Sequence, residues 1–112
     1  MASLTSELAS FVTGLTLDAV PDEAWAMAKT GITDCIGVMV AGARDAAVSL
    51  IDRQISSADG DSKASLIPTG AKRNAEDAAL VNGCAAHVLD YDDVTLDGHP
   101  SAVPVPAIFA QG

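Results

Sequence analysis

A chain of 112 residues with 49% hydrophobic side chains is long enough to bury one core, so we expect a folded domain and exclude general disorder. The formal net charge of −9, with only 6 Lys and Arg residues, argues against nucleic acid or an anionic membrane surface as a partner, because both require clustered cations. No apolar run approaches the roughly 20 residues that span a bilayer, and the first residues do not resemble a signal peptide, so we expect a cytoplasmic protein.

Apolar residues recur at helical spacing along most of the chain, and this periodicity predicts four helices before the last quarter of the sequence. Pro21 is expected in the first turn of the second helix, where its missing N–H costs nothing, and Asn74 is expected to cap the fourth. The four predicted helices cover residues 4–15, 21–41, 45–57 and 75–89.

The pattern changes between the third and fourth predicted helices. A turn cluster at residues 56–61 is followed by residues 64–67, which fit either a short strand or extended chain, and residues 69–72 continue the loop. Cys35 and Cys84 both lie in helical patterns, so we expect two buried thiols.

A fifth helix is expected near the end of the chain. Ser101 can cap it, and Pro104 and Pro106 then lie in its first turn or just before it. Residues 107–112 are typical of a helix that has barely begun, so we expect one incomplete domain over residues 1–112. The sequence thus predicts an all-α fold of about five helices.

The residues suited to chemistry gather between the fourth and fifth predicted helices. Imidazoles and carboxylates that lie so close repel one another or share protons, and this cost is typical of a functional site. The residues concerned are His87, Asp90, Asp92, Asp93, Asp97 and His99.

Asp90 and His99 flank this loop, which helices are expected to hold on both sides. A carboxylate and an imidazole held in this way can act as base and acid in proton transfer. Pro100 restricts His99 to extended backbone conformations and so fixes the direction of its ring. His87 lies three residues before Asp90, on the adjacent helical face, where it can orient Asp90 or contact a substrate.

Two other interpretations of the loop stay open. Its aspartates supply the hard oxygen ligands that Mg²⁺ or Ca²⁺ prefers, which would make an Asp-rich metal-binding module, although the spacing is not that of an EF-hand. Alternatively, the loop is solvated and its aspartates cap helix ends and turns, the interpretation that we favour for Asp92 and Asp97 individually.

Several motifs of the chain together resemble one known family. They are Leu8-Ala9-x-Phe11-Val12, Asp34-Cys35-Ile36-Gly37-Val38, Asn82-Gly83-x-x-Ala86-His87-x-Leu89-Asp90-Tyr91-Asp92-Asp93, His99-Pro100-Ser101 and Pro106-Ala107. These motifs are similar to those of the MmgE/PrpD family, which includes 2-methylcitrate dehydratase, cis-aconitate decarboxylase and iminodisuccinate epimerase. The resemblance extends over nearly the whole chain and is most specific in residues 82–107.

The resemblance implies a mostly helical protein, usually a homodimer, that works without a metal or an organic cofactor. Family members move a proton next to a carboxylate of a small di- or tricarboxylate, and elimination, decarboxylation or epimerisation follows. The decarboxylase branch often has a threonine directly after the Asp-Asp pair, where this chain has Val94. The loop is also about one residue shorter than in that branch. Both departures favour another family reaction over decarboxylation of cis-aconitate.

The resemblance also implies roles for single residues. Asp90 and His99 match active-site positions of the family, so His99 is expected to be the acid or base, and Asp90 to orient it or share its proton. The substrate pocket is then expected to be lined by Tyr91, His87, Thr95 and Ser101.

These observations predict the N-terminal fragment of a cofactor-independent lyase that resembles 2-methylcitrate dehydratase and acts on a small polycarboxylate. Family members are several times longer, and their active-site lysines lie beyond residue 112, so the chain alone is expected to be catalytically silent or very weak. We expect a homodimer, or a chain docked on the missing C-terminal part. The competing hypothesis is a non-catalytic helical remnant or subunit that docks on a partner chain.

Overall fold

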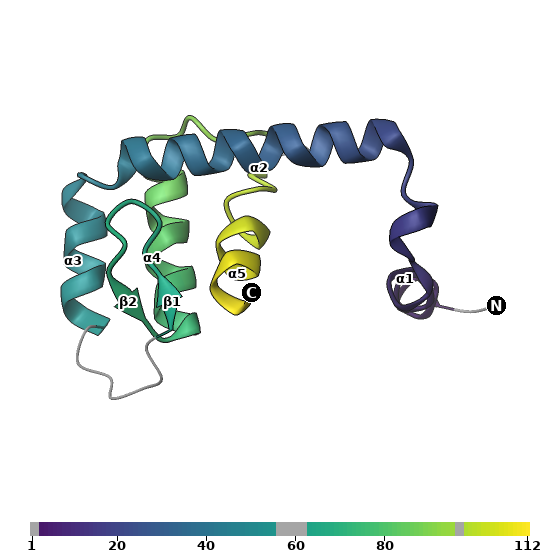
Figure 1. Ribbon diagram of the computed structural model, residues 1–112, viewed down its shortest axis with the longest axis horizontal. Helices are drawn as coiled ribbons and strands as arrows, with labels where there is room; N and C mark the ends of the chain where they lie inside the picture. Colours follow the sequence, from purple (N-terminus) through teal and green to yellow (C-terminus); the bar gives the residue numbers. More distant parts are fainter. Residues whose placement is uncertain (1–2, 56–62, 96–97) are drawn as a thin grey trace.

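A helix of 21 residues, α2 (Asp22–Gly42), runs along one side of the molecule, and the other helices lie beneath it (Figure 1). The computed structural model describes residues 3–55, 63–95 and 98–112. In these ranges it contains five α-helices, which confirms the predicted mostly helical fold. The remaining elements are α1 (Leu4–Gly14), the 3₁₀ helix η1 (Leu17–Ala19), α3 (Ala46–Ile55), β1 (Ala64–Ser65), β2 (Lys72–Arg73), α4 (Ala75–His87) and α5 (Pro104–Gln111).

Polar side chains next to the helix in the sequence cap the starts of α3 and α4. Asn74 caps α4 as predicted, because its Oδ1 accepts a hydrogen bond from the Asp77 N–H at 2.8 Å. Asp45 does the same for α3, where its Oδ1 accepts from the Ala47 N–H at 2.8 Å. Pro21 is the residue before α2 and not part of its first turn, a shift of one position from the prediction.

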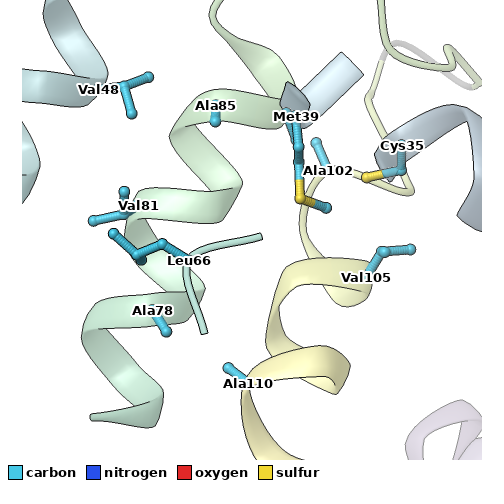
Figure 2. Close-up of a cluster of buried hydrophobic side chains, with 11 residues drawn as sticks. Cys35, Met39, Val48, Leu66, Ala78, Val81, Ala85, Ala102, Val105 and Ala110 are labelled. Atoms are coloured by element: carbon cyan, nitrogen blue, oxygen red, sulfur yellow. The ribbon is translucent and has the colours of Figure 1, made fainter. Parts of the chain in front are cut away.

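The core forms where α2, α4 and α5 meet (Figure 2). Met39 reaches from α2 into the space between α4 and the start of α5. Small residues such as Ala78 and Ala85 line the buried side of α4, so the neighbouring helices approach it closely. Cys35 is buried in this cluster, as predicted, whereas Cys84 is only half-buried against it, and both are free thiols. This packing anchors the C-terminal end of α4, where the candidate site begins.

A two-stranded antiparallel hairpin packs against α4 and α5, with Ser65 paired to Lys72. Residues 69–72 were predicted as loop, and this is wrong for Lys72, which lies in β2. The turn needs Gly70, whose φ of 73° is unfavourable for other residues. The buried Asn82 of α4 holds the hairpin, since its side chain accepts from the Ile67 N–H and donates to the Ser65 C=O, both at 3.0 Å.

The predicted N-cap of the fifth helix is wrong. α5 begins at Pro104 and its N-cap is Val103, without a capping side chain, whereas Pro104 and Pro106 do lie in its first turn. Ser101 lies in the turn before the helix, and its hydroxyl donates to Asp93 at 2.6 Å and not to the helix start. The predicted turn cluster 56–61, the last residues of the predicted third helix and Asp97 lie outside the described residues.

α1 lies under the opposite end of α2, apart from the helices that make the core (Figure 1). Its predicted apolar stripe exists, but none of its residues is buried. Leu8, Phe11 and Val12 are all exposed, which leaves an apolar surface on this helix. None of the helices in residues 3–55, 63–95 and 98–112 is both long and apolar enough to cross a membrane.

Candidate active site

The end of α4 turns the chain so that acidic residues face back toward the helix. The Asp90 N–H donates to the His87 C=O at 2.9 Å, and Asp90 has a φ of 55°. This left-handed conformation is uncommon for a residue with a side chain, and aspartate tolerates it better than most because its short polar side chain can bond locally. The reversal brings Asp92 against His87, which occupies the last position of α4.

Asp92 is the centre of the cluster. Its side chain is 0% exposed, and the His87 Nδ1 lies 3.1 and 3.2 Å from its two oxygens. The His99 Nδ1 lies 3.2 Å from the Asp92 Oδ2. This second approach is not a hydrogen bond, because the fully buried His99 Nδ1 has no partner in hydrogen-bond geometry. One buried carboxylate therefore touches both imidazoles.

The two imidazole rings also lie against each other. The centroids of His87 and His99 are 4.4 Å apart, and the ring planes are tilted by 60°. The Nε2 of His99 faces the other way and lies 3.6 Å from the Asp90 Oδ1. The predicted pair of Asp90 and His99 is thus brought together, although 3.6 Å is too long for a direct hydrogen bond and the Asp90 side chain is 79% exposed.

The other predicted site residues differ in exposure and in hydrogen bonding. Tyr91 is 75% exposed beside Asp90. Thr95 is exposed, and its backbone pairs with Gly98 through two hydrogen bonds of 2.9 and 2.8 Å. The hydroxyl of Ser101 is engaged by Asp93. Tyr91 and Thr95 are thus exposed to solvent, whereas the Ser101 hydroxyl is bonded to a protein partner.

Sequence reasoning underestimated Asp92. Its position in the loop suggested a cap or a solvated carboxylate, and its burial between two imidazoles depends on a turn that local patterns do not encode. The available signal was the spacing of five residues between His87 and Asp92 across a helix end. A chain that reverses there brings such residues face to face.

Cys35 lies behind the loop, on α2. Burial first, and then the charges of Asp93, Asp92 and Asp34, raise the pKa of the Cys35 thiol to about 11. The thiol is therefore neutral near pH 7, and its Sγ–H donates to the Ser101 C=O at 3.6 Å. A neutral, buried thiol is a poor nucleophile. Cys35 thus links α2 to Ser101, at the end of the loop.

Four side chains of the cluster could also hold a metal ion. His87, Asp90, Asp92 and His99 each offer one ligand atom, and these atoms all lie within 4.8 Å of one another. Asp93 is not a member of this set, and its two oxygens accept hydrogen bonds from Ser101. Two imidazoles with two carboxylates suit a transition metal such as Zn²⁺, Fe²⁺ or Mn²⁺ better than the Mg²⁺ or Ca²⁺ that four aspartates would suit.

The comparison with protein families agrees with the resemblance that the motifs carry. The family model described as the MmgE/PrpD N-terminal domain matches residues 6–112. Comparison with curated proteins and with solved structures gave no match for this chain. The match begins within α1, extends through α5 and includes His87, Asp90, Asp92 and His99. The chain therefore belongs to the MmgE/PrpD family and represents its N-terminal domain.

Proposed function

We propose that this chain carries the acid–base part of the active site of a lyase that acts on a small di- or tricarboxylate, in the manner of 2-methylcitrate dehydratase. The observation that supports this best is the position of His99, whose two ring nitrogens face Asp92 and Asp90. An imidazole held between carboxylates, with one nitrogen toward the exposed side, is suited to move a proton.

Dehydration of a hydroxy acid needs two proton movements. A base removes a proton from the carbon next to a carboxylate, the electron pair forms the C=C bond, and the C–O bond breaks as an acid protonates the departing hydroxyl group to give water. We assign one of these steps to His99. Asp90, at its Nε2, orients the ring or shares its proton, and the buried Asp92 fixes the ring from the other side. His87, Tyr91 and Thr95 are proposed to line the substrate pocket.

The charge of the substrate sets a further requirement. A polycarboxylate must be held by cations, because hydrogen bonds from charged donors are the strong ones for carboxylate groups. The chain contains no Lys or Arg after Arg73, so the segment that carries the cluster cannot supply them. We propose that cationic groups from outside this segment complete the pocket, in line with the lysines that the resemblance implies. The proposed reaction involves no metal or organic cofactor.

Proton exchange with solvent tests this proposal on the chain itself. 2-Methylcitrate and related hydroxy acids are incubated with a high concentration of the protein in deuterium oxide, and NMR measures deuterium at the carbon next to each carboxylate. We expect slow exchange that His99→Gln lowers by roughly 100-fold or more, the range typical of a lost acid or base. Asp18→Asn, in the distant η1, is the matched control and should exchange at the normal rate. Exchange at the wild-type rate in His99→Gln contradicts the proposal.

A second candidate function is transition-metal binding, and the convergence of His87, Asp90, Asp92 and His99 favours it. A metal that binds only the folded chain must raise its unfolding temperature. If this function is correct, Zn²⁺ or Mn²⁺ stabilises the wild type and the Asp93→Asn variant, but not Asp92→Asn. Millimolar metal without any effect on thermal unfolding of the wild type excludes this candidate.

A further inference from the structure

Asp93 and Ser101 close the loop that carries His99. The Ser101 N–H donates to the Asp93 Oδ1 at 3.0 Å, and the Ser101 hydroxyl donates to the Asp93 Oδ2 at 2.6 Å. Both carboxylate oxygens of Asp93 therefore accept hydrogen bonds from one residue eight positions later in the chain. Inside this closed segment, Thr95 and Gly98 form a second link through their backbones. His99 follows directly after this link and precedes the closing residue by two positions.

Ser101 is itself held by two helices. Its C=O accepts from the Val105 N–H in α5 at 3.1 Å and from the Cys35 Sγ–H in α2 at 3.6 Å. Its hydroxyl lies so close to α2 that a Cβ added at Gly31 would come within 3.3 Å of it. Ser101 is thus held by the helices of the core, and a side chain that bonds to Ser101 is held to the core through it.

We propose that Asp93 is a positioning residue, whose paired hydrogen bonds to Ser101 hold the His99 ring against Asp92 and within reach of Asp90. Asp93 acts through Ser101 and Pro100, since both of its oxygens are occupied by Ser101. The meaning of this role for catalysis rests on the proposed function. The positioning of the His99 ring by Asp93 is itself tested without substrate.

Two substitutions distinguish whether Asp93 acts through its hydrogen bonds or through its charge. An asparagine can make both links, because its Oδ1 can accept from the Ser101 N–H and its Nδ2–H can donate to the Ser101 Oγ. An alanine can make neither. Asp93→Asn should therefore keep His99 in place although it removes a charge, whereas Asp93→Ala should release it. A residue needed for its charge, as a metal ligand or a base, would fail in both variants.

NMR of the histidine side chains is the test. In the wild type the rings of His87 and His99, with centroids 4.4 Å apart, should give a ring-to-ring nuclear Overhauser effect and separate, dispersed signals. We expect the same cross-peak in Asp93→Asn, its loss in Asp93→Ala, and a weakened cross-peak in Ser101→Ala, which retains only the link through the backbone N–H.

Two results would overturn the proposal. One is an unchanged cross-peak and unchanged His99 shifts in Asp93→Ala; the other is loss of the cross-peak in Asp93→Asn. Amide signals of α4 around Asn82 report whether each variant is folded. If Asp93→Ala does not fold, Asp93→Asn and Ser101→Ala decide, and an unperturbed His99 in Ser101→Ala then refutes the role. Exchange on substrates that His99→Gln does not slow would contradict the proposed function but leave this result unaffected.

Discussion

Gly42, at the end of α2, is predicted to lose stability with any larger side chain, because of the way α2 meets α4. A Cβ at this position would overlap the backbone carbonyl oxygen of Ala85 and would lie 2.9 Å from the Val88 Cγ1 and 3.2 Å from the Ala85 carbonyl carbon. The Val88 side chain can rotate away, but the Ala85 carbonyl belongs to α4 and cannot move by itself. Gly42→Ala must therefore push the two helices apart.

The expected magnitude follows from two opposing effects. Alanine favours helix over glycine by about 1 kcal/mol in a helix interior, and by less at Gly42, which is the last residue of α2. Forcing an extra methyl group into a packed interface costs about 1–3 kcal/mol, and more when the obstacle is backbone. The free energy of unfolding should therefore fall by roughly 1–3 kcal/mol in Gly42→Ala, because the steric cost exceeds the gain in propensity.

Gly37 is a matched control on the same helix. A Cβ there meets nothing within 4 Å, so Gly37→Ala should gain about 0.5–1 kcal/mol from the reduced backbone freedom of the unfolded chain. Urea unfolding followed by circular dichroism measures both variants against the wild type. The reasoning is refuted if Gly42→Ala is as stable as Gly37→Ala. Because α4 ends at His87, the displaced helix should also shift the His87 and His99 signals in Gly42→Ala only.

Three further predictions concern the core, the buried thiol and the exposed helix. Asn82→Ala should lose roughly 2–4 kcal/mol of unfolding free energy, since two part-buried backbone groups, the Ile67 N–H and the Ser65 C=O, lose their partners. Urea unfolding measures this loss, and an unchanged free energy of unfolding would contradict it. The pKa of the Cys35 thiol is raised from 9.0 to about 11, so the stability that the neutral thiol contributes is complete below pH 9 and is lost as the pH rises toward 11. In urea titrations at several pH values, the free energy of unfolding of Cys35→Ala should therefore fall less over this pH range than that of the wild type. The exposed apolar residues of α1, including Phe11, are consistent with the predicted homodimer, which light scattering after size-exclusion chromatography should detect, and a stable monomer would contradict it.

The helices were predictable because their signals are local. Apolar periodicity placed α2 and α4 to within a residue or two, and Asn74 caps α4 through a partner only three positions away. The candidate pair of Asp90 and His99 and the family were also visible in the sequence, since residue types in order suffice for a motif. The hairpin strand β2 was missed, because a strand of two residues contains no alternation that a pattern can detect.

The centre of the site was decided by the tertiary structure. Asp92 is buried between His87 and His99 only because the chain reverses at Asp90 and because the core holds the segment that precedes α5. Serine is common as a helix N-cap, yet Ser101, which lies close to α2, donates its hydroxyl hydrogen to Asp93. The sequence by itself determined which groups can carry the chemistry. Packing determined which of them touch, because those contacts join segments whose positions depend on separate helices.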